Sequence, residues 1–513
     1  MKMVKSLILG SAAGLIAMSG AQAADLPVKA KAVEYVRICS LYGAGFWYIP
    51  GTDTCIKLGG YLRVETAFNA SVFNGAYGGQ LGAQNRLSNY YTARSRQDLT
   101  IDTRTATEYG VVRTFFDATF SWTSGTYAGN AASPGSTVYS GGVGQVGNPS
   151  DGGIAGGSVG VYHAFIQFAG FTLGKTISPF DAPWTNYPGN NFDGLVGGSG
   201  TVTAVNQITY DAQFGNGVSG TLALVDPTAY NQSNLFNLST GLVVGPAFTG
   251  GAYGLNDFGG TRAPDIIGRI KVDQAWGIFQ FSAVAHNNHA AYYVPGVETA
   301  GHPEDKWGWA VQGALQIKNI PTGAGDTINL QAVYTDGATR YNLSSLVPQN
   351  FAMFGGTNAP GAYQSVGIAA AADGVFAAGT GIDTVQTWGM RGAFNHNWDP
   401  YWNSALYGAY AQVNYKAAGA TLICNGVAAL GAATAGITTC NPDFNIAQLG
   451  FITRWTPVKN LTFSADVAYT HLDQKFAGTV VAGPFAGVAK PAARYELKDQ
   501  DTVSLLLRAQ RNF

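Results

Sequence analysis

The chain has 513 residues and a formal net charge of −1, which excludes the strongly basic or acidic balance of proteins that bind nucleic acid or charged surfaces by bulk electrostatics. Charged residues make up only 12% of the chain, about half of the roughly 25% usual in soluble domains, while it contains 69 glycines, 26 tyrosines and 27 phenylalanines. This composition disfavours a soluble enzyme and favours a protein that contacts lipid through half of its side chains.

The first predicted element is a secretory signal peptide. Two lysines precede an apolar run over 7–18, and an Ala-Gln-Ala cleavage site follows at 21–23. The run is shorter than the roughly 20 apolar residues that span a bilayer, which argues against the alternative of a membrane anchor. We therefore predict a signal peptide over 1–23 and a single mature domain over 24–513.

Strands are predicted through most of the remaining chain, because apolar and polar residues alternate there with period 2. Near the end, for example, Val503, Leu505 and Leu507 alternate with Ser504 and Arg508. The sixteen predicted strands, most of about 10 to 13 residues, lie at 57–66, 93–104, 108–121, 158–169, 170–177, 201–212, 217–226, 264–274, 276–287, 306–318, 327–336, 383–396, 401–415, 444–456, 461–472 and 500–513.

The stretch ARSRQDLTIDTRT at 93–105 indicates what surrounds these strands. Its arginines and aspartates take even positions, whereas Leu99 and Ile101 take odd positions. A charged side chain that faced lipid at mid-depth would cost about 2–4 kcal/mol, whereas an inner face can be polar where water fills it. We therefore expect Leu99 and Ile101 to face lipid and the charged residues to face an aqueous lumen.

The connections between the predicted strands alternate in length. Short turns such as 215–216 and 397–402 contrast with long segments rich in Gly, Ser and Asn. Short turns on one rim and long loops on the other are typical of outer-membrane barrels, and sixteen strands leave room for an aqueous channel. A soluble β-sandwich or lectin-like domain is the alternative, but the low charge and the strand count argue against it. The long segments are 122–157, 227–263, 337–382 and 416–443.

Four cysteines form two local pairs in the sequence, Cys39 with Cys55 and Cys424 with Cys440. An even number of cysteines in an exported chain indicates disulfides, and nearest-neighbour pairing would close two surface segments. Metal binding is the alternative, but the spacings are far from the C-x₂-C of metal sites.

Four stretches resemble the porins of alphaproteobacteria. ICSLYGAGFWYIPGTDTCIKLGGYLRVE is similar to their opening, YTARSRQDLTIDTRTATEYGVVRTFFD to the next two strands, AFIQFAGFTLGKTISPFD to the strand pair before the constriction loop, and LLLRAQRNF to the closing strand. The resemblance implies a homotrimer in the bacterial outer membrane, in contact with lipid and lipopolysaccharide, that passes small hydrophilic solutes and ions by passive diffusion. We predict no enzymatic activity, because no nucleophile elbow or similar context is present, and no nucleic-acid partner, because no basic patch is present. Passive diffusion implies no cofactor.

The resemblance also implies that the third external loop, counted along the chain, folds into the barrel and narrows the pore. By strand count this loop is ISPFDAPWTNYPGNNFDGLVGGSG at 177–200, which carries Asp181 and Asp193 and no lysine or arginine. Its three prolines fix backbone angles and stiffen it, as suits a segment held inside a channel. The alternative is an ordinary external loop. The predicted fold is thus an all-β, 16-stranded antiparallel transmembrane β-barrel with an inward-folded third loop.

The predicted pore constriction has a basic and an acidic side. If Asp181 or Asp193 faced the lumen-facing cations, a transverse field would cross the narrowest point and influence which ions pass. The alternative is that some arginines pair with acids at strand ends and serve stability only. Arg104 lies about 33 Å along the strand from Arg94, so the two cannot share one depth. The basic candidates are Arg63, Arg94, Arg96, Arg113, Arg104 and Lys175.

Three further patterns are interpreted as structural. The G-x-G-x-x-G pattern at 142–147 has no βαβ unit around it and is predicted to be loop glycine. His286, His289 and His302 are close in sequence, but we do not predict a metal site there. Aromatic residues with lipid parity predict contacts at the membrane interface or between subunits: Trp307, Trp309, Tyr162, Phe168, Phe463 and Tyr469.

The sequence therefore predicts a general diffusion channel with a charged constriction. A solute-specific channel and a structural or adhesive surface protein are the alternatives, and single-channel conductance separates the three. The sign of ion selectivity, the exclusion size and the physiological solute remain open.

Overall fold

The computed structural model describes residues 37–69, 90–124, 152–154, 157–242, 253–344, 346–347, 349–484 and 490–513. Within this part, sixteen antiparallel strands form a closed barrel, in which each strand pairs with the next and the last pairs with the first. They are β2 (Cys55–Phe68), β3 (Tyr91–Thr107), β4 (Gly110–Ser124), β6 (Gly157–Phe168), β7 (Phe171–Thr176), β8 (Val205–Gly215), β9 (Val218–Val225), β12 (Asp265–Gln274), β13 (Gly277–Asn288), β14 (Lys306–Lys318), β15 (Thr327–Asp336), β20 (Gln386–Asn397), β21 (Trp402–Asn414), β23 (Phe444–Val458), β24 (Leu461–Gln474) and β27 (Gln500–Asn512).

All sixteen predicted strands are confirmed, with ends that differ by a few residues. The predicted signal peptide at 1–23 and the glycine pattern at 142–147 lie outside the described residues. The two faces of the wall differ as the alternation predicts: Arg94 and Arg96 of β3 are only 4% and 7% exposed, whereas Leu62 and Val64 of β2 are each 49% exposed on the outside. The outer face is thus apolar, as contact with lipid requires.

Tyr162 is the exception among the aromatic residues predicted to face lipid. Its ring lies in the barrel, with the centroid 5.3 Å from the guanidinium carbon of Arg96. The pairing of β4 with β6 shifts register between Asp117 and Ala118, and such a bulge changes the side on which neighbouring residues lie. The other five aromatic residues of that group are exposed.

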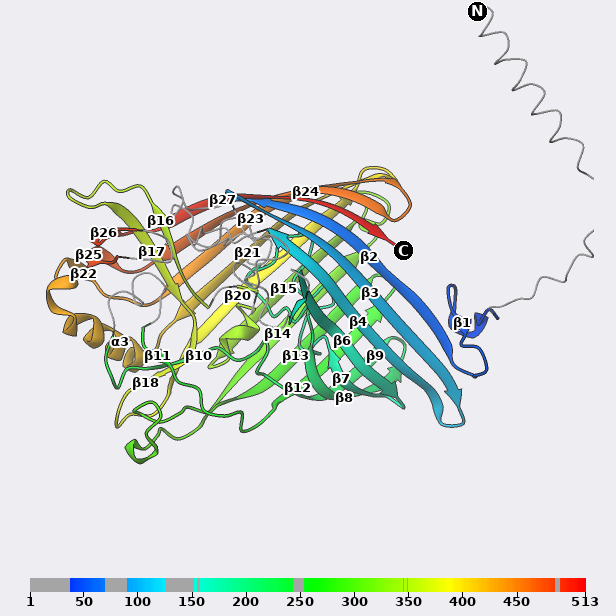
Figure 1. Cartoon of the computed structure of the whole chain (residues 1–513), viewed down its shortest axis with the longest axis horizontal. Helices are drawn as coiled ribbons and strands as arrows, with labels where there is room; N and C mark the ends of the chain where they lie inside the picture. The colour runs from blue at the N-terminus through cyan, green and yellow to red at the C-terminus, as the bar shows by residue number, and fades with distance from the viewer. Residues whose placement is uncertain are drawn as a thin grey trace, which may run out of the picture.

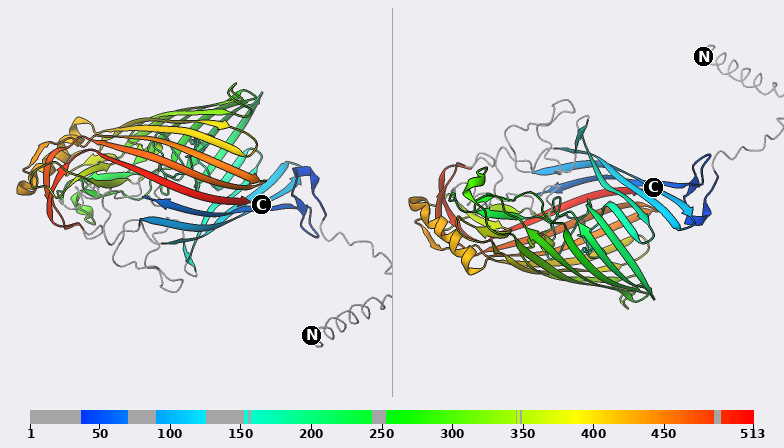
Figure 2. Two further views of the ribbon diagram at one scale, coloured as in Figure 1. Left: turned by 90° about the horizontal axis from the view of Figure 1, so that it is seen from above. Right: turned by 90° about the horizontal axis from the view of Figure 1, so that it is seen from below.

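The two rims of the barrel are built differently. Short turns connect the strands on the rim that carries the C-terminus, at the right of Figure 1, and the long loops gather on the opposite rim. The segment before β2 lies beside the short-turn rim and contains β1 (Trp47–Tyr48) (Figure 2). Alternating turns and long loops therefore separate to opposite rims, as predicted.

The long loops fold into a compact unit that we call the head: residues 226–242, 253–264, 337–385, 415–443, 475–484 and 490–499. Within the described residues, α3 (Ala417–Ala429) is the one α-helix, and no helix there is long and apolar enough to cross a membrane. The head also contains two small sheets. One consists of β11 (Leu255–Asn256), β10 (Asn234–Asn237), β18 (Ala372–Phe376) and β19 (Asp383–Thr384), and the other of β16 (Asn350–Gly355), β17 (Gln364–Ala370), β26 (Ala493–Leu497), β25 (Ala477–Ala482) and β22 (Ile437–Thr439).

The core of the head continues onto the inner face of the barrel. Phe351 and Ile368 of the head belong to the same buried apolar cluster as Tyr407, Val413 and Phe444 of the wall. The polar inner face expected from the stretch 93–105 therefore does not extend to β21 and β23. Apolar side chains that face inward must be covered to leave water, and the head covers them. The open part of the lumen therefore lies against other strands.

Both predicted disulfides are confirmed. Cys39 is bonded to Cys55 at the start of β2, and Cys424 of α3 is bonded to Cys440. The first holds the segment before β2 to the barrel, and the second holds α3 to the segment that enters β23.

Replacing both Cys424 and Cys440 by serine is expected to loosen the head but not the barrel. The bond closes a loop with a sequence separation of 16, and such loops contribute roughly 3 kcal/mol through the unfolded state. Limited proteolysis should then cut within 416–443 while the strands remain resistant. The same double substitution at Cys39 and Cys55 is the control, and it should leave 416–443 protected. Equal protection of both variants would contradict this role.

Candidate pore constriction

Loop 177–200 enters the barrel after β7 and crosses to the opposite wall. Its carbonyl groups accept hydrogen bonds from inward-facing amides: Gln280 Nε2 donates to the Asp181 carbonyl at 2.7 Å, and Asn329 Nδ2 donates to the Pro188 carbonyl at 2.6 Å. Farther along, the Val196 amide donates to Gln448 Oε1 at 3.0 Å. These contacts reach β13, β15 and β23, so the predicted inward fold of the third loop is confirmed.

Arg391 of β20 is the main anchor of this loop. Its side chain is buried, Nε donates to Gln331 Oε1 at 2.9 Å, and Nη1 donates to Asn186 Oδ1 at 2.9 Å and to the Leu195 carbonyl at 3.0 Å. Nη2 donates to the carbonyls of Thr185 and Ser199. One guanidinium thus ties both halves of the loop to the wall.

Asp181 holds the two ends of the loop together. Its Oδ2 accepts hydrogen bonds from the Thr201 amide at 2.6 Å and the Thr201 hydroxyl at 2.9 Å, and only 4% of the residue is exposed. Burial raises the pKa of Asp181, although the hydrogen bonds from Thr201 oppose that shift. Its position favours a structural role, away from the arginines with which it was predicted to interact.

Asp193 and Tyr187 lie on the side of the loop that stays partly exposed. The Tyr187 hydroxyl donates to Asp193 Oδ1 at 2.5 Å. Burial, and then the neighbouring Asp193 carboxylate, raise the pKa of Tyr187 well above its ordinary value, so its hydroxyl remains a donor at neutral pH. Asn191, two residues before Asp193, accepts a hydrogen bond from Arg508 of β27, so this part of the loop lies near the wall that β27 and β2 form.

That wall carries a cluster that we call the arginine wall: Arg63, Arg94, Arg96 and Arg508 around Glu65. Register explains it, because Glu65 pairs with Arg94 on one side and with Arg508 on the other, and Arg63 pairs with Arg96. Glu65 is 1% exposed and accepts hydrogen bonds from Arg94 Nε at 2.6 Å and from Arg508 Nε at 2.8 Å. Arg508 Nη2 also donates to the Asn191 carbonyl of the loop at 3.1 Å.

Arg104 and Arg113 form a separate cluster nearer the short-turn rim. The two residues are paired across β3 and β4, and both guanidinium groups contact Asp102, at 3.0 Å each. About eight residues of strand, or roughly 26 Å, separate Arg104 from Arg96. The structure therefore divides the predicted basic side between two depths. Lys175 is apart from both clusters, and its ammonium donates to the Val161 carbonyl.

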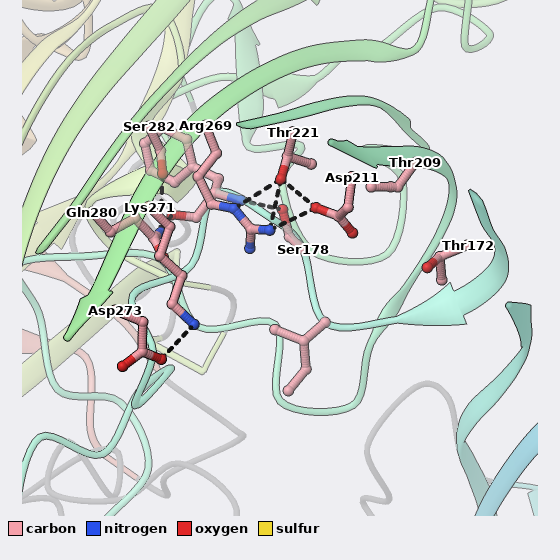
Figure 3. A network of polar contacts seen from close by, with 12 residues as sticks. Thr172, Ser178, Thr209, Asp211, Thr221, Arg269, Lys271, Asp273, Gln280 and Ser282 are labelled. Atoms are coloured by element: carbon pink, nitrogen blue, oxygen red, sulfur yellow. Dashed lines mark hydrogen bonds and ion pairs between the residues drawn. The ribbon is translucent and has the colours of Figure 1, made fainter. Parts of the chain in front are cut away.

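A second polar patch lines the wall beside the entry of the loop (Figure 3). Arg269 of β12 donates to Asp211 Oδ1 at 2.9 Å and to the Thr221 hydroxyl at 3.1 Å, and Lys271 lies 3.5 Å from Asp273 (Figure 3). This patch was not predicted from the sequence, and neither were Arg391 and Arg508. These residues occupy the alternate positions of their strands that face the lumen, and this pattern in the sequence could have identified them.

The histidines considered as a metal site have other partners. His286 Nδ1 lies 2.7 Å from Asp265 Oδ1, and His289 Nδ1 lies 2.7 Å from Asp305 Oδ1. His302 Nδ1 forms a hydrogen bond with the Pro303 carbonyl. Among the described residues no group of three or more His, Cys, Asp or Glu side chains is placed to hold a metal ion.

Comparison with known proteins agrees with this architecture. A family model described as the porin subfamily matches residues 25–506. Porin Omp2b of Brucella suis biovar 1 (strain 1330) is 31% identical over 358 residues, which cover 65% of this chain and 85% of that protein. Porin Omp2b of Brucella neotomae is 30% identical over 69% of this chain and 78% of its own length.

A solved structure supports the fold alone. The outer membrane channel DcaP of Acinetobacter baumannii superposes with a TM-score of 0.55 at 15% identity, over 91% of this chain and 99% of that chain. The strand count, the inward-folded loop and the family match therefore lead to one conclusion. The chain belongs to the porin subfamily and is a channel for passive diffusion across the bacterial outer membrane.

Proposed function

We propose that the narrowest point of this channel lies between the arginine wall and the Tyr187–Asp193 side of loop 177–200. The observation that carries the proposal is the contact of Arg508 with both Glu65 and the Asn191 carbonyl, because it brings wall and loop to one depth. Arg63, Arg94 and Arg96 form the basic side and Asp193 the acidic side. Arg104, Arg113 and Lys175 lie outside this point, and Asp181 serves the fold of the loop.

The proposal extends to the assembly and its solutes. The channel passes small hydrophilic solutes and ions down their gradients, without a cofactor and without catalysis. It assembles as a homotrimer within outer-membrane lipid and lipopolysaccharide, and its mature domain covers 24–513. The family resemblance supports these features. The half-buried charges that line the open lumen support passage of hydrated solutes, since polar lumen walls are typical of porins.

A single cysteine on the loop tests the position of the narrow point. All four native cysteines are in disulfides, so Tyr187→Cys provides a unique thiol. Attachment of a bulky methanethiosulfonate reagent is expected to lower the single-channel conductance in planar bilayers severalfold. Tyr401→Cys, at a 56% exposed position in a short turn, is the matched control and should change little. Equal effects at both positions would argue against a constriction at Tyr187.

A further inference from the structure

The constriction proposed above has an excess of positive charge. The arginine wall carries four guanidinium groups around one carboxylate, that of Glu65, and the loop faces it with Asp193. Four cations thus meet two carboxylates there when both acids are ionised. The rest of the wall at the loop adds Lys175, Arg391 and Arg454 and the acids Asp98, Asp117 and Asp466.

The pairing of these charges is uneven. Glu65 is held between Arg94 and Arg508, so one carboxylate neutralises part of two guanidinium groups. Arg63 Nε donates to the neutral Gln510 at 2.8 Å, and Arg96 Nε donates to the neutral Ser121 at 3.0 Å. Among the ion pairs of the described residues, neither Arg63 nor Arg96 has a carboxylate partner.

The acids nearby are engaged with other groups. Asp193 accepts the Tyr187 hydroxyl, and in the ion pairs of the described part of the chain neither Asp98 nor Asp117 has a guanidinium partner. Guanidinium groups retain their charge at any physiological pH and present donor pairs that match a carboxylate in geometry. A carboxylate in transit thus meets donors that the protein itself leaves to neutral partners.

The excess continues toward the short-turn rim. Arg104 and Arg113 share Asp102, and Lys271 and Lys318 share Asp273. An anion that passes the arginine wall therefore meets cations that share single carboxylates on both sides of the lumen. Charges of one sign along a pore determine which ions enter and pass.

We infer that the channel prefers anions and that Arg63 and Arg96, which are paired across β2 and β3, bind the carboxylate of small organic anions as they pass the loop. This assignment rests on the proposed constriction. The favoured solutes are small carboxylate anions. Bidentate contact of guanidinium with carboxylate gives a transient site without a closed pocket.

Reversal potentials in a KCl gradient test the sign, with dilute salt so that screening is weak. The native channel should show a chloride-to-potassium permeability ratio above 1, and Arg63→Gln/Arg96→Gln should reduce this ratio to about 1 or less. Arg262→Gln removes the same charge at a 65% exposed side chain of the head, away from the arginine wall, and is the control. Asp193→Asn should raise the ratio, a gain that a misfolded channel would not produce.

Succinate tests the binding step. When succinate is added to one side of the bilayer, it should interrupt the single-channel current of the native protein. In the double variant most of these interruptions should disappear. If the native channel conducted ions with a chloride-to-potassium permeability ratio of 1 or less, the anion preference would be overturned. The conductance itself would still support the proposed function. An anion preference unchanged by the double variant would overturn the assignment to Arg63 and Arg96. A channel without conductance would overturn the proposed function itself.

Discussion

Arg391→Met is expected to release loop 177–200 from the wall and to raise both the single-channel conductance and the size of solute that passes. The guanidinium makes five hydrogen bonds, four of them to the loop. Its loss leaves buried carbonyls of the loop without a donor, and each buried acceptor without a partner costs about 1–3 kcal/mol. That cost falls on loop docking, because the barrel hydrogen bonds of β20 remain intact.

A second substitution tests the same docking without removing a charge. Gly197 has φ +85°, and a Cβ there would lie 2.3 Å from the Met390 carbonyl oxygen, so Gly197→Ala should also displace the loop. Gly215 has the same φ and open space around it, which makes Gly215→Ala the matched control. Liposome swelling with sugars of increasing size measures the exclusion limit. Native conductance and exclusion in both Arg391→Met and Gly197→Ala would contradict the anchoring role.

The strands could be predicted because two solvents enforce the alternation. Lipid outside and water inside leave little freedom of register, since a slip by one residue exchanges the two faces. Tyr162 shows the limit of this argument. The alternation along its strand predicts that Tyr162 faces lipid, but a bulge opposite Asp117 and Ala118 places its ring beside Arg96. A bulge depends on the partner strand, so period counting along one strand does not detect it.

The level of a residue along the barrel axis was harder to predict than the side of the wall on which its side chain lies. Parity places Arg94, Arg96 and Arg104 on the lumen side, but which residues share a level depends on cross-strand register. That register pairs Glu65 with Arg94 and separates Arg104 with Arg113 toward the rim. Similarly, the sequence offers Asp181 and Asp193 as equivalent acids of one loop. Only the folded path of the loop buries the first against Thr201 and leaves the second partly exposed.

The head could not be derived from composition. Its segments are rich in Gly, Ser and Asn and were expected to be external loops, yet they pack around an apolar core. The inward-facing Tyr407, Val413 and Phe444 were the available sign, because apolar residues on a lumen face require a cover. The partners that supply this cover lie far away in sequence, and local patterns do not identify them.

Asp373→Asn is expected to detach the head from the barrel wall. Asp373 is fully buried, and its carboxylate accepts the Thr339 amide at 2.6 Å, the Thr339 hydroxyl at 2.8 Å and the Ser233 amide at 2.8 Å. Its Oδ2 also lies 3.6 Å from His286 Nε2 of β13. The carboxylate thus joins two head segments, 226–242 and 337–385, to the wall, and its neutralisation removes the counter-charge of buried groups at a cost of about 3–5 kcal/mol.

The expected readouts are faster proteolysis within 337–382 and a higher conductance, because the head covers part of the lumen. Burial alone would raise the pKa of Asp373, but His286 and the backbone donors outweigh burial and lower it below the ordinary 3.8. A lowered pKa means that the stabilisation is complete at neutral pH and is lost as the pH falls through the lowered value. Acid should therefore reproduce the substitution only below pH 3.8. Asp305→Asn, in the exposed pair with Arg262, is the control. If both variants kept native proteolysis and conductance, Asp373 would not be the link, and the apolar core alone would hold the head in place.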